Sequence, residues 1–384
     1  MWFIHPDPRV SCYYLPLTVS VTVLSIRSMT IHKIARLAKV SIATVSRTIN
    51  GVPTVDPVLA RRVWRVIEKQ GYYPNRHARS LVSGRSRIFG LMVPEAPNAF
   101  FPEIIHTFAR LCIQHNYQVL LSAICQDAGL LETAARQMIE RRVDGVAILT
   151  FREQESLVEI FRDRNVSVFV IDSDRPGPLL RSVCIDYQHG IRQAVQHLAA
   201  LGHNRIAFVS GPAHLKTAAV QKNAFHACMK EIGLQVAAEI LLEGDHTMEA
   251  GAEAASSLVS LRHRPTAVVC SNDLMAIGLM HKASELYLDI PGDLSVVGFE
   301  DIPFAKYMIP QLTTVQISRE EIATVAFEAL FAAADPAING DTQIVSSIAT
   351  NLVVRGSTSM GPGRVRDGRR SRAGRAHAQA NRFI

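Results

Sequence analysis

Apolar residues near the start of the chain recur at helical spacing. The segment "IHKIARLAK" places its apolar side chains on one face of a helix, with Thr30 as its N-cap. Ser41 is a second N-cap, and it opens a helix that runs through about Thr48 with Val45 and Ile49 on its inner face. The pattern therefore predicts two short helices separated by a tight turn.

A third helix follows in "VDPVLARRVWRVIEKQG". Asp56 is its N-cap, Pro57 stands at its first position, and Gly71 ends it. The valine and isoleucine side chains on one face of this helix are expected to pack against the first two. Residues 29–74 are thus predicted to form one compact all-α unit.

From residue 88 onward the pattern changes. Continuous apolar runs such as "IFGLMV", "VSVFVI", "TAVVCS" and "LSVVGF" alternate with helical patterns. Such runs are typical of parallel strands covered on both faces. About nine such strands exceed one comfortable open sheet, which favours two doubly wound α/β lobes. We expect lobe one at about 88–186 and 316–340, and lobe two at about 187–315 and 341–358.

The remaining segments lie outside these domains. Residues 75–87 predict a short hinge helix and a linker. Residues 1–28 contain the apolar stretch "YYLPLTVSVTVLSI", which resembles a signal-peptide core, but no small-residue cleavage site follows it. We expect this segment to be a non-native or disordered N-terminal extension. Residues 359–384 are rich in Gly and Arg and lack periodicity, which predicts a disordered tail.

The net charge of +7 is unevenly distributed. Residues 30–87 contain 12 Lys and Arg against two acidic residues, residues 88–358 contain 20 basic against 30 acidic residues, and the tail carries seven Arg against one Asp. A basic module joined to an acidic body indicates a polyanionic partner for the module. On charge alone, a solvated basic surface is an equal alternative.

Several function classes find no support. The six cysteines are scattered without a Cys-x-x-Cys pair, which argues against a zinc ribbon or a disulfide scaffold and favours a cytoplasmic location. No run reaches the roughly 18 apolar residues of a membrane span. The segment "GPGRVRDG" follows no strand and lacks the Gly-Lys-Ser/Thr of a phosphate loop, and no catalytic triad or metal-spaced His pair is evident. We expect no enzyme activity and no cofactor or metal.

The first two helices and their turn match a helix-turn-helix, whose second helix lies in the major groove of DNA. With Val45 and Ile49 turned inward, the outward face presents Ile42, Ala43, Ser46 and Arg47. Arg47 can read guanine through two hydrogen bonds, and hydroxyl groups can donate to phosphates. The alternative from these residues alone is an ordinary capped surface helix.

Beyond these patterns, the segment from "TIHKIARLAKVSIATVSRTING" to "GYYPNRHARSLVSGRSRIFGLMVP" resembles the lac-repressor (LacI/GalR) family of bacterial transcription regulators. The later motifs "LGHNRIAFVSGP", "SNDLMAIG", "DLSVVGFEDI", "PQLTTV" and "LVVRGST" agree with it, so the resemblance covers residues 29–358. It implies a helix-turn-helix headpiece, a hinge helix, and a two-lobed core like that of type I periplasmic binding proteins. It also implies a homodimeric repressor that binds a pseudo-palindromic double-stranded DNA operator.

By the resemblance, the recognition-helix role falls on Ile42, Ala43 and Arg47, and the minor-groove wedge of the hinge falls on Leu81. The other DNA-binding positions implied are Thr30, Ser41, Thr44, Ser46, Asn50, Tyr72, Asn75 and Ala78. Lys39 departs from the family, which usually has Gly at that turn. If the position needs a positive φ, Lys is strained there.

A small-molecule effector is expected between the lobes, near the carboxyl ends of the strands. Asp273 follows a strand and can accept hydrogen bonds from hydroxyl groups, although it can equally cap the next helix. Phe101 offers a flat stacking face. The full expected set is Asn98, Phe100, Phe101, Asp172, Thr217, Gln221, His246 and Asp273.

Gln221 stands where family members usually have a ligand-binding Arg. Loss of that guanidinium argues against an anionic effector and favours a sugar or a related neutral polyol. The alternative function, a periplasmic-type sugar-binding protein without a regulatory role, has no use for the basic three-helix unit.

Overall fold

The computed structural model describes residues 29–72, 85–94, 99–124, 127–150, 155–173, 177, 179–334 and 345–362. Expectations for residues 1–28, for residues 75–84 of the hinge and linker, and for most of the tail lie outside the described residues. The same holds for four expected site residues, Asn75, Ala78, Leu81 and Asn98. The chain divides into two compact units, residues 1–79 and 80–384, each described here by itself.

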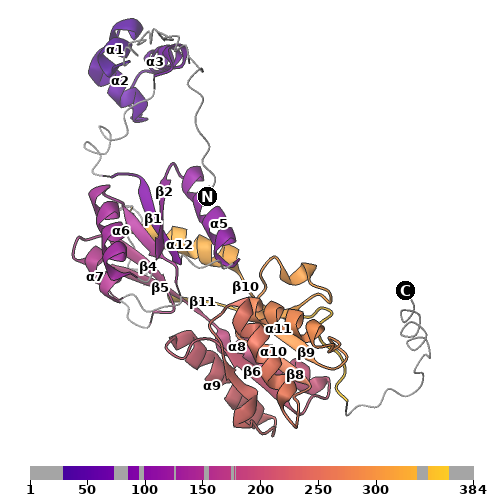
Figure 1. Ribbon diagram of the computed structural model, residues 1–384. Helices are drawn as coiled ribbons and strands as arrows, with labels where there is room; N and C mark the ends of the chain where they lie inside the picture. Colours follow the sequence, from indigo (N-terminus) through magenta and orange to yellow (C-terminus); the bar gives the residue numbers. More distant parts are fainter. Residues whose placement is uncertain are drawn as a thin grey trace, which may run out of the picture. The chain divides into compact units, whose positions relative to one another are not determined.

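The first unit is a three-helix module made of α1 (Ile31–Ala38), α2 (Ile42–Ile49) and α3 (Pro57–Gln70) (Figure 1). Each expected N-cap is confirmed, because Thr30, Ser41 and Asp56 accept backbone N–H groups of the first helical turns through their side chains. The core of the module consists of Ile34, Ala35, Ala38, Val45, Val63 and Ile67.

The turn between α1 and α2 depends on Lys39. Its φ of 52° and ψ of 48° lie in the left-handed region, so the condition under which Lys was expected to be strained is met. This conformation costs a residue with a Cβ about 1–2 kcal/mol. Arg62 of α3 donates a hydrogen bond from Nη2 to the Lys39 oxygen at 3.2 Å, which helps to hold the turn.

The second unit contains two six-stranded sheets. The first sheet has the order β11-β5-β4-β3-β1-β2, and all of its strand pairs are parallel. Its strands are β1 (Ile88–Pro94), β2 (Gln118–Ile124), β3 (Gly145–Ile148), β4 (Ser167–Ile171), β5 (Leu180–Ile185) and β11 (Val345–Ile348). Its helices are α5 (Phe101–Gln114), α6 (Ala128–Glu140), α7 (Glu155–Arg162) and α12 (Arg319–Ala334).

The second sheet has the order β12-β10-β9-β8-β6-β7, and β12 runs antiparallel to β10. Its strands are β6 (Ile206–Ser210), β7 (Leu241–Glu243), β8 (Ala267–Cys270), β9 (Ser295–Glu300), β10 (Thr313–Ile317) and β12 (Thr350–Val353). Its helices are α8 (Tyr187–Ala200), α9 (Lys216–Glu231), α10 (Met248–Ser260) and α11 (Asp273–Glu285), with short 3-10 helices η1 (Ala238–Ile240) and η2 (Ala305–Tyr307).

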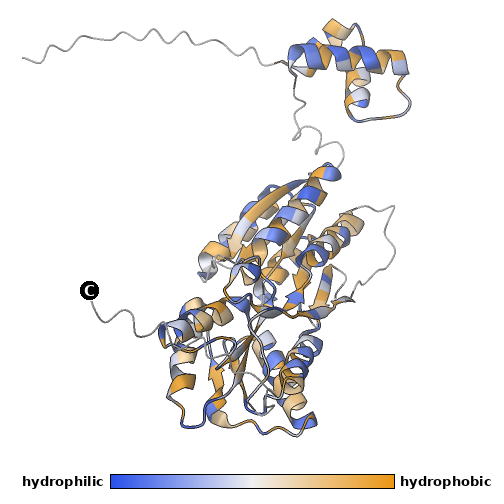
Figure 2. Cartoon of the chain, turned by 90° about the vertical axis from the view of Figure 1, so that its right-hand side faces the viewer, coloured by the Kyte–Doolittle hydropathy of each residue, from blue (hydrophilic) through white to orange (hydrophobic). Residues whose placement is uncertain are grey.

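Alternating side chains cover both faces of the first sheet. In β1, Phe89 and Leu91 join the large core with α5 and α12, whereas Met92 joins a separate core with α6 and α7. The strands of this lobe are accordingly hydrophobic in Figure 2, while its helices carry both hydrophobic and hydrophilic residues. The large core continues into the second lobe, so the two lobes share one buried cluster.

The chain crosses between the lobes at Asp186, Ser318 and Ala349. Two of these crossings are joined, because the Asp186 N–H donates to the Ile348 oxygen at 3.0 Å and the Thr350 hydroxyl donates to the Asp186 oxygen at 2.8 Å. The last crossing differs from the expected boundary. β11 pairs with β5 in the first sheet, so the assignment of all of 341–358 to lobe two is wrong for this strand.

The C-terminal tail begins later than expected. Ser359 donates its backbone N–H to Ser295 Oγ at 3.0 Å, and the Gly361 N–H donates to the Leu201 oxygen at 2.9 Å. These bonds hold residues 359–361 on the second lobe, contrary to their assignment to a disordered tail. Among the helices that the structure describes, none is long and apolar enough to cross a membrane.

Candidate functional site

Three of the four residues expected on the outward face of α2 lie as the helical spacing predicted, whereas Ser46 is half-buried. Ile42, Ala43 and Arg47 are exposed, and Val45 is fully buried. Thr48 is also buried, which was not expected, and its hydroxyl donates to the Thr44 oxygen at 2.8 Å. The side chains of Ile42, Ala43 and Arg47 are therefore accessible to the major groove of DNA.

The start of α2 favours anions. Ser41 Oγ caps the helix by accepting the Thr44 N–H at 3.0 Å, and it lies 2.8 Å from the Thr44 hydroxyl. The first turn of α2 contains no acidic residue, so the positive end of the helix dipole is not neutralised there. Ser46 is half-buried and Asn50 is exposed at the other end of the helix. These polar groups lie beside the exposed face formed by Ile42, Ala43 and Arg47.

Two other expected DNA-binding residues stand outside α2. Thr30 is exposed and caps α1. Tyr72 is half-buried and packs against the core of the module, so at least part of its ring has a structural role. Basic side chains also cover the exposed surface of α3, namely Arg61, Arg62, Arg65 and Lys69.

A small cavity lies in the second unit where neighbouring strands of lobe two end. Ser271 follows β8, Glu300 ends β9, and Ile317 ends β10. The described residues that line it are Tyr187, Thr217, Gln221, His246, Ser271, Phe299, Glu300 and Ile317. Its volume of about 20 Å³ accommodates roughly one water molecule, so binding of a larger ligand requires these side chains to move apart.

Two buried polar atoms in this lining have no hydrogen-bond partner among the described residues. They are the Ser271 hydroxyl and Oε2 of Glu300. Burial, and then the charge of Asp273, raises the pKa of the Glu300 carboxyl well above its usual range. Since buried polar groups are almost always paired, both atoms are candidates for contact with a bound ligand.

Of the eight expected effector residues, the structure brings Thr217, Gln221 and His246 to this cavity. Gln221 donates from Nε2 to the Ser271 oxygen at 3.2 Å. Burial lowers the pKa of His246 to about 4, so its ring is neutral near pH 7. A methyl group at Gly211 would collide with this ring, which explains why the residue opposite it is glycine.

Asp172 lies outside the cavity and binds one of its lining residues, Tyr187. One carboxylate oxygen accepts the Ile185 N–H at 2.9 Å, and the other accepts the Tyr187 hydroxyl at 2.7 Å. Burial raises the pKa of Asp172 to about 6. Asp172 is not part of the cavity lining, and it orients Tyr187, which is.

Asp273 is fully buried and is also absent from the lining. Its carboxylate accepts the Thr314 hydroxyl at 2.5 Å and the Ile302 N–H at 2.8 Å, and burial raises its pKa to about 7. The alternative of helix capping is wrong for this residue, because Asn272 is the N-cap of α11 and accepts the Met275 N–H at 3.0 Å. Asp273 thus holds together the turn that presents Glu300.

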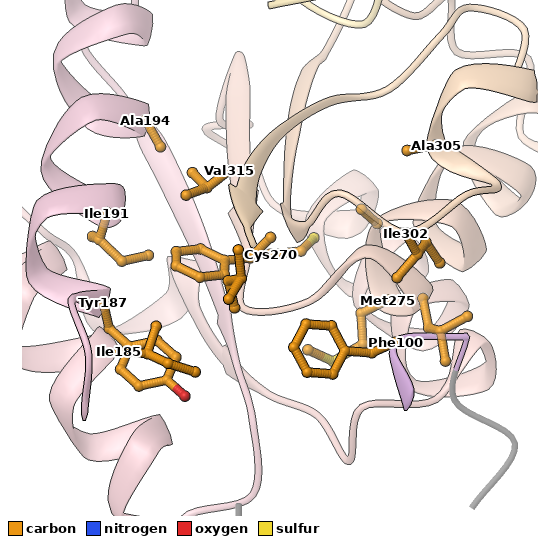
Figure 3. Close-up of a cluster of buried hydrophobic side chains, with 14 of the residues drawn as sticks. Phe100, Ile185, Tyr187, Ile191, Ala194, Cys270, Met275, Ile302, Ala305 and Val315 are labelled. Carbon is orange, nitrogen blue, oxygen red and sulfur yellow. The ribbon is translucent and has the colours of Figure 1, made fainter. Parts of the chain in front are cut away.

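Phe100 and Phe101 are buried and meet edge to face with ring centroids 5.4 Å apart. Neither ring lines the cavity. Figure 3 shows Phe100 lying beside Met275 and Ile302, which belong to lobe two. The stacking face expected of Phe101 is therefore used inside the protein core.

Sequence reasoning missed five lining residues, Tyr187, Ser271, Phe299, Glu300 and Ile317. The signal for two of them was present, because Ser271 and Glu300 stand at strand ends in "TAVVCSND" and "VVGFED". Among the described residues, no group of three or more His, Cys, Asp or Glu side chains could hold a metal ion.

Comparison with known proteins agrees with this division of the chain. Residues 30–75 match the model of bacterial regulatory proteins of the lacI family, and residues 195–358 match a periplasmic binding protein-like domain. Catabolite control protein A of Priestia megaterium is 33% identical over 304 residues, which cover 79% of this chain and 92% of that protein. The transcriptional repressor PurR of Vibrio vulnificus is 33% identical over 307 residues, covering 78% and 90%.

Solved structures give the same result. The lac repressor dimer bound to operator and the anti-inducer ONPF has a TM-score of 0.76 and 25% identity, covering 87% of this chain and all of that one. The complex of the transcriptional regulator CelR with cellobiose has a TM-score of 0.65 and 26% identity, covering 86% and 99%. Both the three-helix unit and the two-lobed unit thus have counterparts of the same fold in these structures.

Proposed function

The chain belongs to the lacI family of bacterial regulatory proteins, and from this we propose that two copies bind one operator and respond to a neutral small molecule. It is a DNA-binding transcriptional repressor with an effector-binding domain, in a family of regulators rather than enzymes. A transport receptor without a regulatory role is therefore set aside. We place the protein in the cytoplasm, where it can reach chromosomal DNA.

The exposed face of α2 is the main structural support for sequence-specific DNA binding. Arg47, Ile42 and Ala43 point away from a module whose core lies on the opposite side of the helix. We assign base contacts to these three residues. Phosphate contacts are assigned to the polar groups around them, Thr30, Ser41, Thr44, Ser46 and Asn50.

The hinge residues Asn75, Ala78 and Leu81 complete the proposed DNA contacts on the strength of the sequence alone. Leu81 is proposed to enter the minor groove and bend the operator. Circular-permutation gel shifts test this role: Leu81→Ala should bind with a smaller bend angle, and a bend equal to that of the unsubstituted protein would remove the wedge.

A dimer is proposed because one headpiece reads too few base pairs, and because a two-fold protein matches a palindromic operator. Lobe two exposes apolar side chains that a monomer would leave in water, with Ile309 96%, Tyr307 72% and Phe304 54% exposed. All three lie in the segment around η2. Sedimentation of Ile309→Asp is expected to show monomers where the unsubstituted protein shows dimers.

The effector is proposed to be a sugar or a related neutral polyol. The Ser271 hydroxyl and Oε2 of Glu300 have no partner among the described residues, and hydroxyl groups of a polyol can both donate to and accept from such groups. The described residues of the lining include Gln221 and neutral His246 and no Arg or Lys, so among them none offers a cation to an anionic ligand. CelR, a structural relative, was solved with cellobiose, which fits this class.

A thermal-shift series tests the effector class directly. Cellobiose, glucose, glucose 6-phosphate and hypoxanthine are compared at equal concentrations, since a ligand at 100 times its Kd adds about 2.7 kcal/mol of stability. A neutral sugar should raise the Tm, and the rise should be lost in Glu300→Gln and Ser271→Ala. A rise with glucose 6-phosphate alone, or one that both variants retain, would contradict the assignment.

A further inference from the structure

Arg319 occupies an unusual place at the junction of the two lobes. It is the first residue of α12, directly after the crossing at Ser318, and only 9% of it is exposed. An arginine buried to this extent is costly unless its donors are satisfied on several sides. The hydrogen-bond partners of Arg319 in each lobe therefore indicate its structural role.

On the side of lobe two, Arg319 Nη1 donates to the backbone oxygen of Glu300 at 2.8 Å. Glu300 is the cavity residue whose Oε2 has no partner in the described part of the chain. Its φ is 108° and that of Asp301 is 54°, so two consecutive residues hold a conformation that residues with a Cβ rarely adopt. Such a turn persists only where its neighbours hold it, and Arg319 is one of them.

On the side of lobe one, Arg319 Nε donates to Glu103 Oε2 at 2.6 Å in the first turn of α5. The guanidinium carbon also lies 5.9 Å from the centre of the Phe100 ring. Phe100 immediately precedes α5 and reaches into the core of lobe two beside Met275 (Figure 3). One guanidinium thus joins the start of α5 to the backbone of the effector cavity.

We propose that Arg319 is the positioning residue that relays the state of the effector cavity to lobe one. A ligand that engages the Glu300 carboxyl shifts the Glu300–Asp301 turn, and with it the carbonyl oxygen that Arg319 binds. Arg319 then changes its hold on Glu103 and Phe100, and so on the start of α5. The relay rests on the proposed function of the cavity as the effector site.

Hydrogen exchange of the intact protein, read by mass spectrometry, tests the relay without effector or DNA. Glu103→Gln removes a charge on lobe one and leaves every group of lobe two in place. We expect it to speed exchange of the Asp301 and Ile302 amides across the lobe boundary by about threefold or more. In an Arg319→Met background, the same substitution should add nothing.

The matched control is Glu320→Gln. Glu320 pairs with Arg110 at 3.6 Å between the same two helices, but on the surface. Glu320→Gln should leave the exchange rates of the Asp301 and Ile302 amides unchanged. If Arg319→Met fails to fold, Arg319→Lys provides the second background, because an ammonium lacks the fork that reaches both partners.

Equal acceleration by Glu103→Gln in both backgrounds, or none in either, overturns the relay. Because neither ligand nor operator is present, that failure is distinct from a failure of the proposed function. The latter would appear in the thermal-shift series while the exchange result stood.

Discussion

The hydroxyl of Tyr187 donates a hydrogen bond to the carboxylate of Asp172 across 2.7 Å, and it does so between the lobes. Asp172 follows β4 of lobe one, whereas Tyr187 opens α8 of lobe two and lines the cavity. Together with Arg319 and the joined crossings at Asp186, this bond ties the cavity to both lobes. The cavity is therefore built into the junction that must change if the lobes move.

Tyr187→Phe should destabilise the protein by about 1–3 kcal/mol, because it leaves a buried carboxylate oxygen without its donor. Chemical denaturation at pH 7.5 measures the loss. Tyr307→Phe is the control, since that ring is largely exposed and its hydroxyl is free to contact water. An equal effect of both substitutions would show that the bond to Asp172 contributes nothing.

Lys39→Gly should stabilise the three-helix module by about 1 kcal/mol, because glycine adopts the left-handed conformation without a Cβ clash. Hydrogen exchange of the α1–α3 amides in the intact protein reports the gain as slower exchange. Asn50→Gly serves as the control, since Asn50 ends α2 at a φ of −86° where glycine relieves no strain. Faster exchange in Lys39→Gly would contradict a strained turn.

The raised pKa of Asp273 leads us to expect that folding stability depends on pH. Burial raises its pKa to about 7 in the folded protein, against an ordinary value of 3.8. The unfolded chain thus releases this proton first, and folding stability falls as the pH rises from about 4 to 7, by at most about 1.4 kcal/mol per pH unit. Above pH 7 this contribution is constant.

Comparison with Asp273→Asn isolates that dependence from the histidines, whose lowered pKa values act in the opposite direction. The difference in free energy of unfolding between the two proteins should shift by about 2–3 kcal/mol between pH 5 and pH 7, in favour of Asp at the lower pH. A constant difference across this range would mean that Asp273 is ionised throughout.

The sequence predicted the module of three helices well because its signals are local. The caps at Thr30, Ser41 and Asp56 act within one turn. Strain at Lys39 was expected only on the condition of a positive φ, and that expectation came from the Gly usual at this turn in the family. Strands such as β1 and β4 were recognisable because both of their faces are buried. The segments "TTVQI" and "TNLV", which form β10 and β12, mix polar with apolar residues and escaped notice.

The cavity was predictable only in part, for a physical reason. A carboxylate at a strand end can face a cavity, as Glu300 does, or turn inward to brace a loop, as Asp273 does. The local sequence around Glu300 and Asp273 is similar, because each is an acidic residue at or just after the end of an apolar strand. The orientation of each carboxyl depends on partners such as Thr314, which lie far along the chain. β11 similarly joins the first sheet through pairing with β5, which no local pattern indicates.

The exposed face of α2 is proposed to read DNA sequence. Binding-site selection with the intact protein, followed by affinity measurement, tests this role. Selected sites should be pseudo-palindromic, and Arg47→Ala should lose about 1–3 kcal/mol of preference at one symmetric base-pair position. Arg65→Ala, on the exposed surface of α3, should weaken binding to all sites alike. Unchanged sequence preference in Arg47→Ala, or no preference in the unsubstituted protein, would contradict the account.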